Sequence, residues 1–317
     1  MFALCIECSH ARGMGHFYRA LNLAECLSQL KFPFIFYLNN DKPALAILAE
    51  RYLPHRIVDL NDISSNWESE LIRVDGIVLW INDRLNTDHR HAQKVKAVGV
   101  PLVTFDDRGT GAALADLNIA ALSFNENEIL GGARVLRGTE YLILNSQIED
   151  CTRVRTRVDS ILVTMGGSDT YGLTIIVVKM LKAMGLTATI IIGPSFAHQA
   201  MLKSAIPEDF VIKQGLNSLI HEYLLHDLAI TGGGITPFEA NASGLPCVII
   251  ANETFEIPAG RELERLGCSS FVGYHKTLES PLFNLNLPIE QMSINGINNI
   301  GLDGSQRVVS ALMVLLP

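Results

Sequence analysis

Short apolar runs alternate with amphipathic stretches along most of the chain. Apolar runs bounded by turn residues predict strands, and apolar residues that recur three and four positions apart predict helices. In the first half the predicted strands are residues 2–8, 34–38, 56–60, 76–81, 102–105 and 116–122, and the predicted helices are residues 17–30, 44–51, 67–72 and 89–98. This alternation is typical of a parallel sheet with helices on both faces.

The alternation restarts after residues 146–159, a charged stretch that we interpret as a linker. Beyond it the predicted strands are residues 161–165, 188–192, 210–213, 228–231 and 247–251, and the predicted helices are residues 173–184, 218–225, 259–266 and 305–316, with one more beginning at residue 236. Residues 124–140 and 281–299 show no period that can be assigned.

The two halves predict an α/β chain of two Rossmann-like, doubly wound domains, residues 1–150 and 151–317. The last helix can pack back on the first domain in this scheme. Ligands of such sheets bind outside the carboxyl ends of the strands, so we expect a cleft between two facing domains.

Composition narrows the classes of partner. The chain has 317 residues, a formal net charge of -8 and a pI near 5.6, and its Lys and Arg residues do not cluster, which argues against a nucleic-acid surface. The N-terminus lacks a basic segment before its apolar run, and no uncharged apolar stretch is long enough to cross a membrane. We expect a cytoplasmic protein without a transmembrane segment, and peripheral membrane contact stays open.

The six cysteines lie mostly inside apolar runs. Cys5 and Cys8 form a C-x-x-C pair, but positions i and i+3 of a strand face opposite sides, and no second Cys or His pair stands at ligand spacing. We therefore expect buried thiols and no metal.

The stretch 228–246 carries the strongest local signal for a ligand. A predicted strand runs into three glycines, Gly232 to Gly234, and Thr236 and Pro237 then suit the start of a helix. Glycines leave backbone N–H groups accessible, and a helix start favours negative charge, so a phosphate would bind well there.

Glu239 has two interpretations at this helix start. It follows Thr236 by three residues, which is the spacing of a capping box, and that common arrangement is favoured by the local spacing alone. In the other interpretation its carboxylate accepts from a ribose hydroxyl of a nucleotide whose phosphates lie on the glycines.

The first loop contains Gly13 and Gly15 but fails as a dinucleotide fingerprint. The third glycine position is Tyr18, and the next predicted strand ends in two asparagines where an acidic ribose ligand would be needed. The loop still places His16 at the start of a helix, where it is either a general acid or base or only caps the helix or bonds a neighbour. Arg19, one turn on, either holds the loop or faces solvent.

A second strand-to-glycine turn is formed by Gly166, Gly167, Ser168 and Asp169. Gly, Ser and Asp also make ordinary turns between a strand and a helix, so this sequence alone is not specific. Two such turns in one half of the chain fit one diphosphate better than two coincidences.

Several motifs occur together in a fixed order along the chain. They are Gly13-Met-Gly-His16 with Arg19, Phe105-Asp-Asp107, Gly166-Gly-Ser-Asp169, and Gly233-Gly-Ile-Thr-Pro-Phe-Glu239-Ala240 with Gly244-x-Pro246. Over about residues 1–270 the chain resembles the family of the spore-coat polysaccharide biosynthesis glycosyltransferase-like protein and the UDP-sugar hydrolase of the pseudaminic acid pathway. Both are relatives of the peptidoglycan N-acetylglucosaminyltransferase, which has the GT-B fold.

The resemblance implies a GT-B protein that binds a UDP-sugar as its substrate, with no other cofactor. By this likeness Gly233, Gly234 and Thr236 face phosphate, Glu239 the ribose, Leu219 the uracil and His16 the reacting centre. The remaining nucleotide candidates are Gly166, Gly167, Ser168 and Ile235. The candidates for contacts with substrate are Gly13, Gly15, Arg19, Asn82, Asp83 and Glu256.

The chain departs from the family at several positions. The hydrolase has an Asp-x-Tyr pair where this chain has Trp80-Ile-Asn-Asp-Arg84, which weakens the hydrolytic interpretation. Ile235 replaces a serine, and Glu256 replaces a glutamine near the donor sugar, where a carboxylate would accept from sugar hydroxyls and repel acidic sugars.

These observations predict cleavage of the anomeric C1–O bond of a UDP-sugar, with His16 deprotonating an acceptor hydroxyl during surface-glycan assembly. Transfer is slightly favoured over hydrolysis, in which water replaces the unknown acceptor. An inactive protein that only binds nucleotide-sugars is the third hypothesis.

Overall fold

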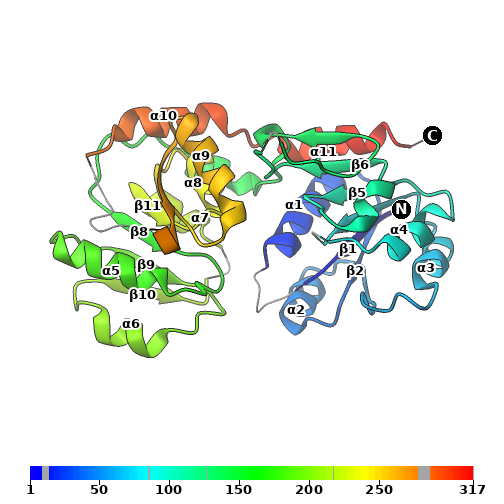
Figure 1. The fold of residues 1–317 in the computed structure, drawn as a ribbon, viewed down its shortest axis with the longest axis horizontal. Helices are drawn as coiled ribbons and strands as arrows, with labels where there is room; N and C mark the ends of the chain where they lie inside the picture. Colours follow the sequence, from blue (N-terminus) through cyan, green and yellow to red (C-terminus); the bar gives the residue numbers. More distant parts are fainter. Residues whose placement is uncertain (9–13, 85, 126, 217, 278–285, 317) are drawn as a thin grey trace. The chain divides into compact units, whose positions relative to one another are not determined.

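The structure, a computed structural model, describes residues 1–8, 14–84, 86–125, 127–216, 218–277 and 286–316. The described chain divides into two compact units (Figure 1). Among the described residues, unit 1 comprises residues 1–8, the residues from Met14 to Leu144 and those from Asp303 on, and unit 2 runs from Asn145 to Leu302. The break thus lies near the predicted boundary at residue 150, and the C-terminal segment belongs to unit 1.

Unit 1 is built on a parallel sheet, which has seven strands in the described part of the chain and the order β3-β2-β1-β4-β5-β6-β7. The strands are β1 (Phe2–Ile6), β2 (Phe34–Leu38), β3 (His55–Ile57), β4 (Leu79–Asp83), β5 (Leu102–Phe105), β6 (Leu117–Ala120) and β7 (Val135–Arg137). The helices are α1 (Gly15–Gln29), α2 (Lys42–Glu50), α3 (Trp67–Asp75), α4 (His89–Lys96) and α11 (Gly304–Met313).

Both faces of this sheet are buried, which explains the continuous apolar runs in β1 and β2. On one face Leu4 and Phe36 pack with Phe17 of α1 and Val308 of α11. On the other face Trp80 belongs to a cluster that includes residues of α3 and α4. Helix α11, red in Figure 1, lies among the elements of unit 1, although it is far in sequence from the other residues of this unit.

Unit 2 has a second parallel sheet, six-stranded within the described ranges, with the order β10-β9-β8-β11-β12-β13. The strands are β8 (Ile161–Thr164), β9 (Thr189–Ile192), β10 (Val211–Gln214), β11 (Leu228–Thr231), β12 (Cys247–Ala251) and β13 (Ser269–Tyr274). The helices are α5 (Leu173–Ala183), α6 (Gln199–Ala205), α7 (Ile220–Leu225), α8 (Thr236–Ala242), α9 (Ile257–Arg265) and α10 (Ile289–Asn299).

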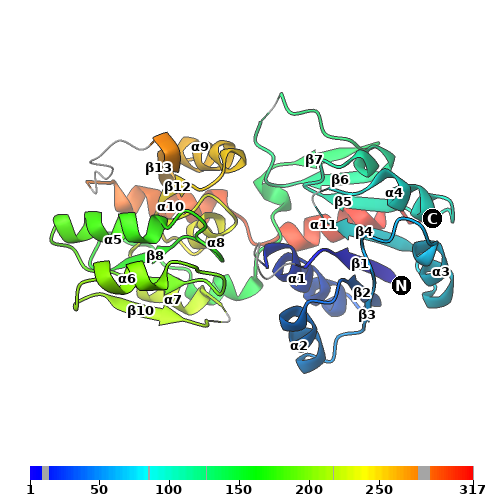
Figure 2. The same ribbon diagram turned by 60° about the horizontal axis from the view of Figure 1, so that its bottom comes forward.

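Helix α10 lies in the region that the sequence left unassigned. It packs on α8, as Figures 1 and 2 show, and Gly296 makes the close contact possible. A Cβ atom at Gly296 would lie only 2.5 Å from the backbone oxygen of Asn241. Residues 281–285 of the same region lie outside the described residues.

The predicted linker, residues 146–159, is instead an ordered part of unit 2. It begins with the 3₁₀ helix η3 (Ser146–Cys151), whose Ile148 and Cys151 are buried. Farther on, the side chain of Arg155 is buried with only 1% of its surface exposed. Charge in the sequence suggested exposure here, but one of those charges is in the interior.

The guanidinium of Arg155 is satisfied by backbone carbonyl groups. It donates to the carbonyl oxygens of Arg153, Tyr223, Ser243 and His226. Tyr223 lies near the C-terminal end of α7, and Ser243 is the C-cap of α8, where unpaired carbonyls favour a cation. Burial lowers the pKa of Arg155 to about 10, so the side chain is charged at neutral pH. It joins the first segment of unit 2 to α7 and α8.

Replacing Arg155 with methionine is expected to lower the free energy of unfolding by about 3 kcal/mol, because four carbonyl oxygens each lose a hydrogen bond from the buried guanidinium. Urea unfolding followed by circular dichroism measures the change. The matched control is Arg157→Met, because the Arg157 side chain is 80% exposed and, among the described residues, its ion pair is with the exposed Asp159. That control should change the free energy by less than about 0.5 kcal/mol. Equal effects of the two substitutions would contradict the assignment.

Candidate functional site

His16 lies in the first turn of α1 and is bonded to a buried carboxylate. Its Nδ1 atom lies 2.5 Å from Oδ1 of Asp83, the last residue of β4. The side chain of Asp83 is 4% exposed and that of His16 is 26% exposed. Within the described residues no group bonds to Nε2 of His16. A carboxylate on Nδ1 orients the ring and stabilises its charged form, which suits Nε2 to take a proton from a ligand.

Arg19 joins Asp83 to a second carboxylate. Its Nε donates to Oδ2 of Asp83 over 2.7 Å and its Nη2 to Oδ1 over 2.5 Å, while Nη1 pairs with Asp106. The guanidinium also lies 5.1 Å from the centre of the Phe105 ring. Burial alone would raise the pKa of Asp83, but the charges of Arg19 and His16 hold it at about 2. Asp83 is therefore ionised at neutral pH.

The topology of the sheet brings these residues together. Strand β4 lies between β1, which leads into α1, and β5, which ends just before Asp106. All three are parallel, so their carboxyl ends meet at one edge. Asp106 has a left-handed backbone with φ of 46°, and its Oδ1 accepts from the N–H of Leu122. The sequence contained the Asp106-Asp107 pair, but nothing in it showed that Asp106 binds Arg19.

Asn82, a predicted substrate ligand, is fully buried on the opposite face of β4. Its Oδ1 accepts from Nε1 of Trp80 and lies 3.1 Å from Nε2 of His91, and its Nδ2 donates to Thr87. These contacts hold the turn after β4 on the face of the sheet opposite to Asp83. The alternation of side chains along a strand separates Asn82 from its neighbour Asp83.

The side chain of Asn39, which follows β2, bonds to the segment that follows β1. Asn39 accepts from the N–H of Cys8 and donates to the carbonyl of Cys8, both over 2.8 Å. Its side chain is therefore used to join the ends of two strands. Gly15, the first residue of α1, is exposed, and Gly13 lies outside the described residues.

Unit 2 places its two glycine turns on neighbouring strands. Gly166 and Gly167 follow β8, and Gly232 to Gly234 follow β11, which pairs with β8 in parallel. Gly166 has a φ of 83°, which favours glycine. The following residues are held locally, since the carboxylate of Asp169 accepts from two N–H groups at the start of α5.

Gly233 lies against Glu256 from the next turn of the sheet. The N–H of Gly233 donates to Oε2 of Glu256 over 3.2 Å, and the same oxygen accepts from the N–H of Asn252 over 2.7 Å. A Cβ atom at Gly233 would lie 2.8 Å from Cβ of Glu256, so the close approach requires glycine. Glu256, predicted to lie near a donor sugar, thus joins two turns.

The predicted capping box at α8 is wrong. Ile235 is the N-cap of this helix, and its apolar side chain makes no capping hydrogen bond. Glu239 instead accepts a hydrogen bond of 3.0 Å from the hydroxyl of Tyr223, a residue of α7 that the sequence did not single out. Burial raises the pKa of Glu239 to about 7. The residue is half-buried, and among the described residues its Oε1 accepts no hydrogen bond.

The other predicted nucleotide residues lie at the same edge of unit 2. Leu219 is the N-cap of α7, on which Tyr223 lies, and it is half-buried. Ile235 and Thr236 are also half-buried at the start of α8. The Oγ of Ser168 contacts the hydroxyl of Thr170 over 3.1 Å.

Neither a membrane-crossing helix nor a metal-ligand cluster occurs in the part of the chain that the structure describes. The cysteines of this part are buried and unpaired.

Replacing Asp83 with asparagine is expected to lower the free energy of unfolding by about 2 kcal/mol near pH 6. The carboxyl pKa is lower in the folded protein than in the unfolded chain, so its stabilising effect is present above about pH 4 and is lost as the pH falls toward about 2. Denaturant unfolding of both proteins near pH 6 and pH 2.5 measures the difference, which should shrink in acid. A difference that is constant with pH would exclude an ionised Asp83 as its source.

Sequence comparison finds two distant relatives. The chain is 26% identical over 274 residues to an uncharacterised protein of Methanocaldococcus jannaschii, covering 78% of this chain but only 55% of that protein. It is 26% identical over 290 residues to the spore coat polysaccharide biosynthesis protein SpsG of Bacillus subtilis, covering 83% of this chain and 81% of that protein. No protein-family model matches the chain.

Similar solved structures span both units. MurG of Acinetobacter baumannii superposes with a TM-score of 0.70 at 14% identity, covering 98% of this chain and 99% of that one. MnaA of S. aureus, in a structure with UDP, superposes with a TM-score of 0.68 at 14% identity, covering 98% and 95%. The chain therefore has the GT-B fold, with two α/β units each built on a parallel sheet.

Proposed function

We propose that this protein is a nucleotide-sugar enzyme that breaks the anomeric C1–O bond of a UDP-sugar and transfers the sugar to an acceptor in surface-glycan biosynthesis. The observation that supports it most is the bond between His16 and buried, ionised Asp83, which leaves Nε2 of His16 for a ligand. The likeness to SpsG, whose name refers to spore coat polysaccharide, supports the class of pathway. The likeness to MnaA, which binds UDP in its structure, supports the nucleotide.

In the proposed reaction His16 acts as the general base. Its Nε2 takes the proton of an acceptor hydroxyl while the oxygen attacks the anomeric carbon and the bond from that carbon to the diphosphate breaks. UDP leaves with the bonding electron pair, and the proton on His16 then passes to solvent. The carboxylate of Asp83 stabilises the imidazolium, and Arg19 keeps that carboxylate ionised.

Unit 2 supplies the proposed nucleotide site. The N–H groups of the two glycine turns, after β8 and β11, would face the diphosphate, and the N–H of Gly233 would be shared with Oε2 of Glu256. Glu239 would accept from the ribose hydroxyls, and Leu219 would contact the uracil. The bond from Tyr223 positions Glu239 for this role.

Turnover distinguishes transfer from its alternatives. The purified protein is incubated with a panel of UDP-sugars, with and without glycan acceptors, and UDP and free sugar are followed by NMR. UDP release that requires an acceptor supports transfer, whereas free sugar without an acceptor supports hydrolysis of the pseudaminic acid pathway type. Binding without release in any mixture would leave a nucleotide-sugar-binding protein and exclude both reactions for the sugars tested.

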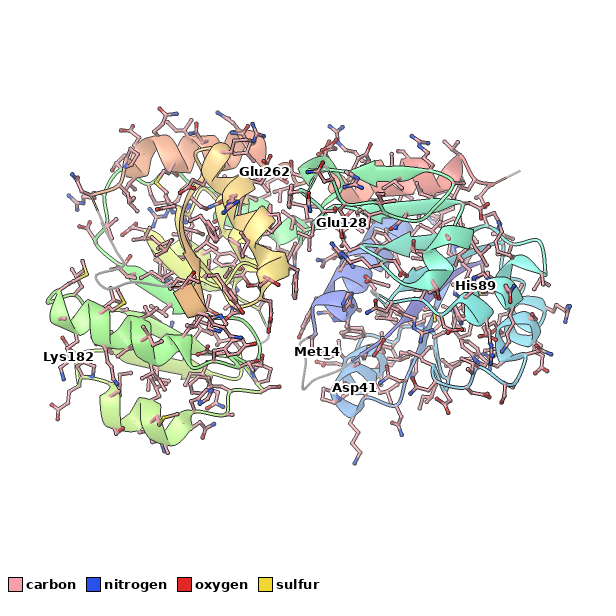
Figure 3. The ribbon with its side chains drawn as sticks, in the orientation of Figure 1. Met14, Asp41, His89, Glu128, Lys182 and Glu262 are labelled. Carbon is pink, nitrogen blue, oxygen red and sulfur yellow. The ribbon has the colours of Figure 1, made fainter. Side chains whose placement is uncertain are left out.

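His16→Ala is expected to reduce turnover at least about 100-fold, because the general base is lost, while UDP affinity stays within a few fold. The matched control is His89→Ala. His89 is exposed at the first position of α4 in the same unit, and it is labelled in Figure 3. The control should turn over normally. Activity that survives in His16→Ala would remove His16 from the mechanism.

Glu239→Ala is expected to weaken UDP binding by about 1–3 kcal/mol through loss of the ribose acceptor. Because the pKa of Glu239 is raised to about 7, UDP affinity of the wild type should also decrease as the pH falls below 7 and the carboxylate becomes protonated. Calorimetry at several pH values measures both effects. Glu262→Ala, which removes a carboxylate of α9 that pairs with Arg265, is the control and should bind UDP normally. Unchanged affinity in Glu239→Ala would exclude the ribose role.

A further inference from the structure

One carboxylate oxygen of Glu256 accepts hydrogen bonds from three backbone N–H groups beside the proposed diphosphate position. Oε2 of Glu256 accepts from Asn252 over 2.7 Å, from Gly233 over 3.2 Å and from Glu253 over 3.4 Å. Its other oxygen, Oε1, lies 4.0 Å from where a Cβ atom of Gly234 would be. An anion of the protein itself therefore lies along the glycines that would face phosphate.

This anion is held by neutral dipoles. Among the described residues no Lys or Arg pairs with Glu256, and the nearest charge of the same turn is another carboxylate, Glu253, which accepts from the hydroxyl of Tyr171. Lys276 contacts an aromatic ring instead, since its amine lies 5.9 Å from the centre of the Tyr171 ring.

The remaining carboxylates of neighbouring elements bond elsewhere. Asp169, after β8, bonds to α5, and Glu239 on α8 bonds to Tyr223. Burial raises the pKa of Glu256, although the N–H groups of Asn252, Glu253 and Gly233 act in the opposite direction. A further negative charge nearby would disfavour its ionised form still more.

We propose that Glu256 takes up a proton when the nucleotide diphosphate binds to the glycine turn, so that its carboxyl group becomes a hydrogen-bond donor to phosphate. The proposal rests on the proposed function, because that function brings the diphosphate to Gly233 and Gly234. A carboxylate and a phosphate that share one set of donors repel each other. A protonated carboxyl group removes this repulsion and still accepts the N–H of Asn252 with its other lone pairs. Binding is therefore linked to proton uptake at one side chain.

Calorimetric titration with UDP tests this linkage. The terminal phosphate of UDP has a pKa near 6 and Glu239 has a pKa of about 7, so above about pH 8 the ligand, Glu239 and ordinary histidines contribute little. Titration in two buffers of different ionisation enthalpy counts the protons, and we expect close to one proton taken up per UDP. The Kd should weaken as the pH rises from about 8 to 9, by up to about tenfold.

Glu256→Gln should abolish proton uptake, and its Kd should be nearly constant with pH and at least about fivefold tighter than that of the wild type near pH 9. The matched control is Glu253→Gln, which changes the neighbouring carboxylate and should retain the uptake and pH dependence of the wild type. Thermal melting checks that both variants fold.

The wild-type titration is informative without any variant. UDP that binds with no proton uptake overturns this inference and leaves the proposed function standing. Uptake that persists in Glu256→Gln overturns the assignment to Glu256. If UDP does not bind the wild type at any pH, the proposed function fails and this inference fails with it.

Discussion

The candidate site of unit 1 depends on one buried cation. Asp83 and Asp106 each have 4% of their side chain exposed, and burial by itself would raise the pKa of Asp83. Arg19 lies between them and donates to both. Because Arg19 keeps Asp83 charged, His16 has an ionised partner for Nδ1. The imidazole, the two carboxylates and the guanidinium form one network of charges, and its residues come from α1, β4 and the turn after β5.

Unit 2 is governed by a different constraint, the need of backbone groups for partners at the ends of strands and helices. Gly193 lets the turn after β9 approach the turn after β8, since a Cβ atom there would lie 2.3 Å from the carbonyl oxygen of Gly167. Glu256 satisfies N–H groups at the carboxyl edge of the sheet, and Arg155 satisfies carbonyl groups near the ends of α7 and α8. Turns that are held in this way present their remaining N–H groups in fixed directions, which is what an anion site requires.

The predicted elements are accurate where the residues of an element by themselves indicate that it is buried. The strands 34–38, 102–105, 228–231 and 247–251 have the predicted bounds, because each is an apolar run that must be buried on both faces. Strand β13 (SSFVGY) and helix α10 (IEQMSINGINN) were not predicted. Their sequences carry polar residues and glycine, and both elements are stabilised by their neighbours. The predicted linker failed for a related reason, since Arg155 is charged in the sequence but interior in the fold.

The sequence by itself determined the alternation of strands and helices, the glycine turns after β8 and β11, and the position of His16 at the start of α1. These features depend on nearest neighbours and on the backbone freedom of glycine, which are local properties of a chain. Only the tertiary structure decided which side chains meet. In the fold His16 contacts Asp83 and Arg19 contacts Asp106, across 67 and 87 residues of sequence. The side chain of Asn82 lies on the other face of β4, and Glu239 bonds to Tyr223 and does not cap a helix. Such pairings depend on strand order and on the face to which each side chain points, and the neighbouring residues in the sequence determine neither.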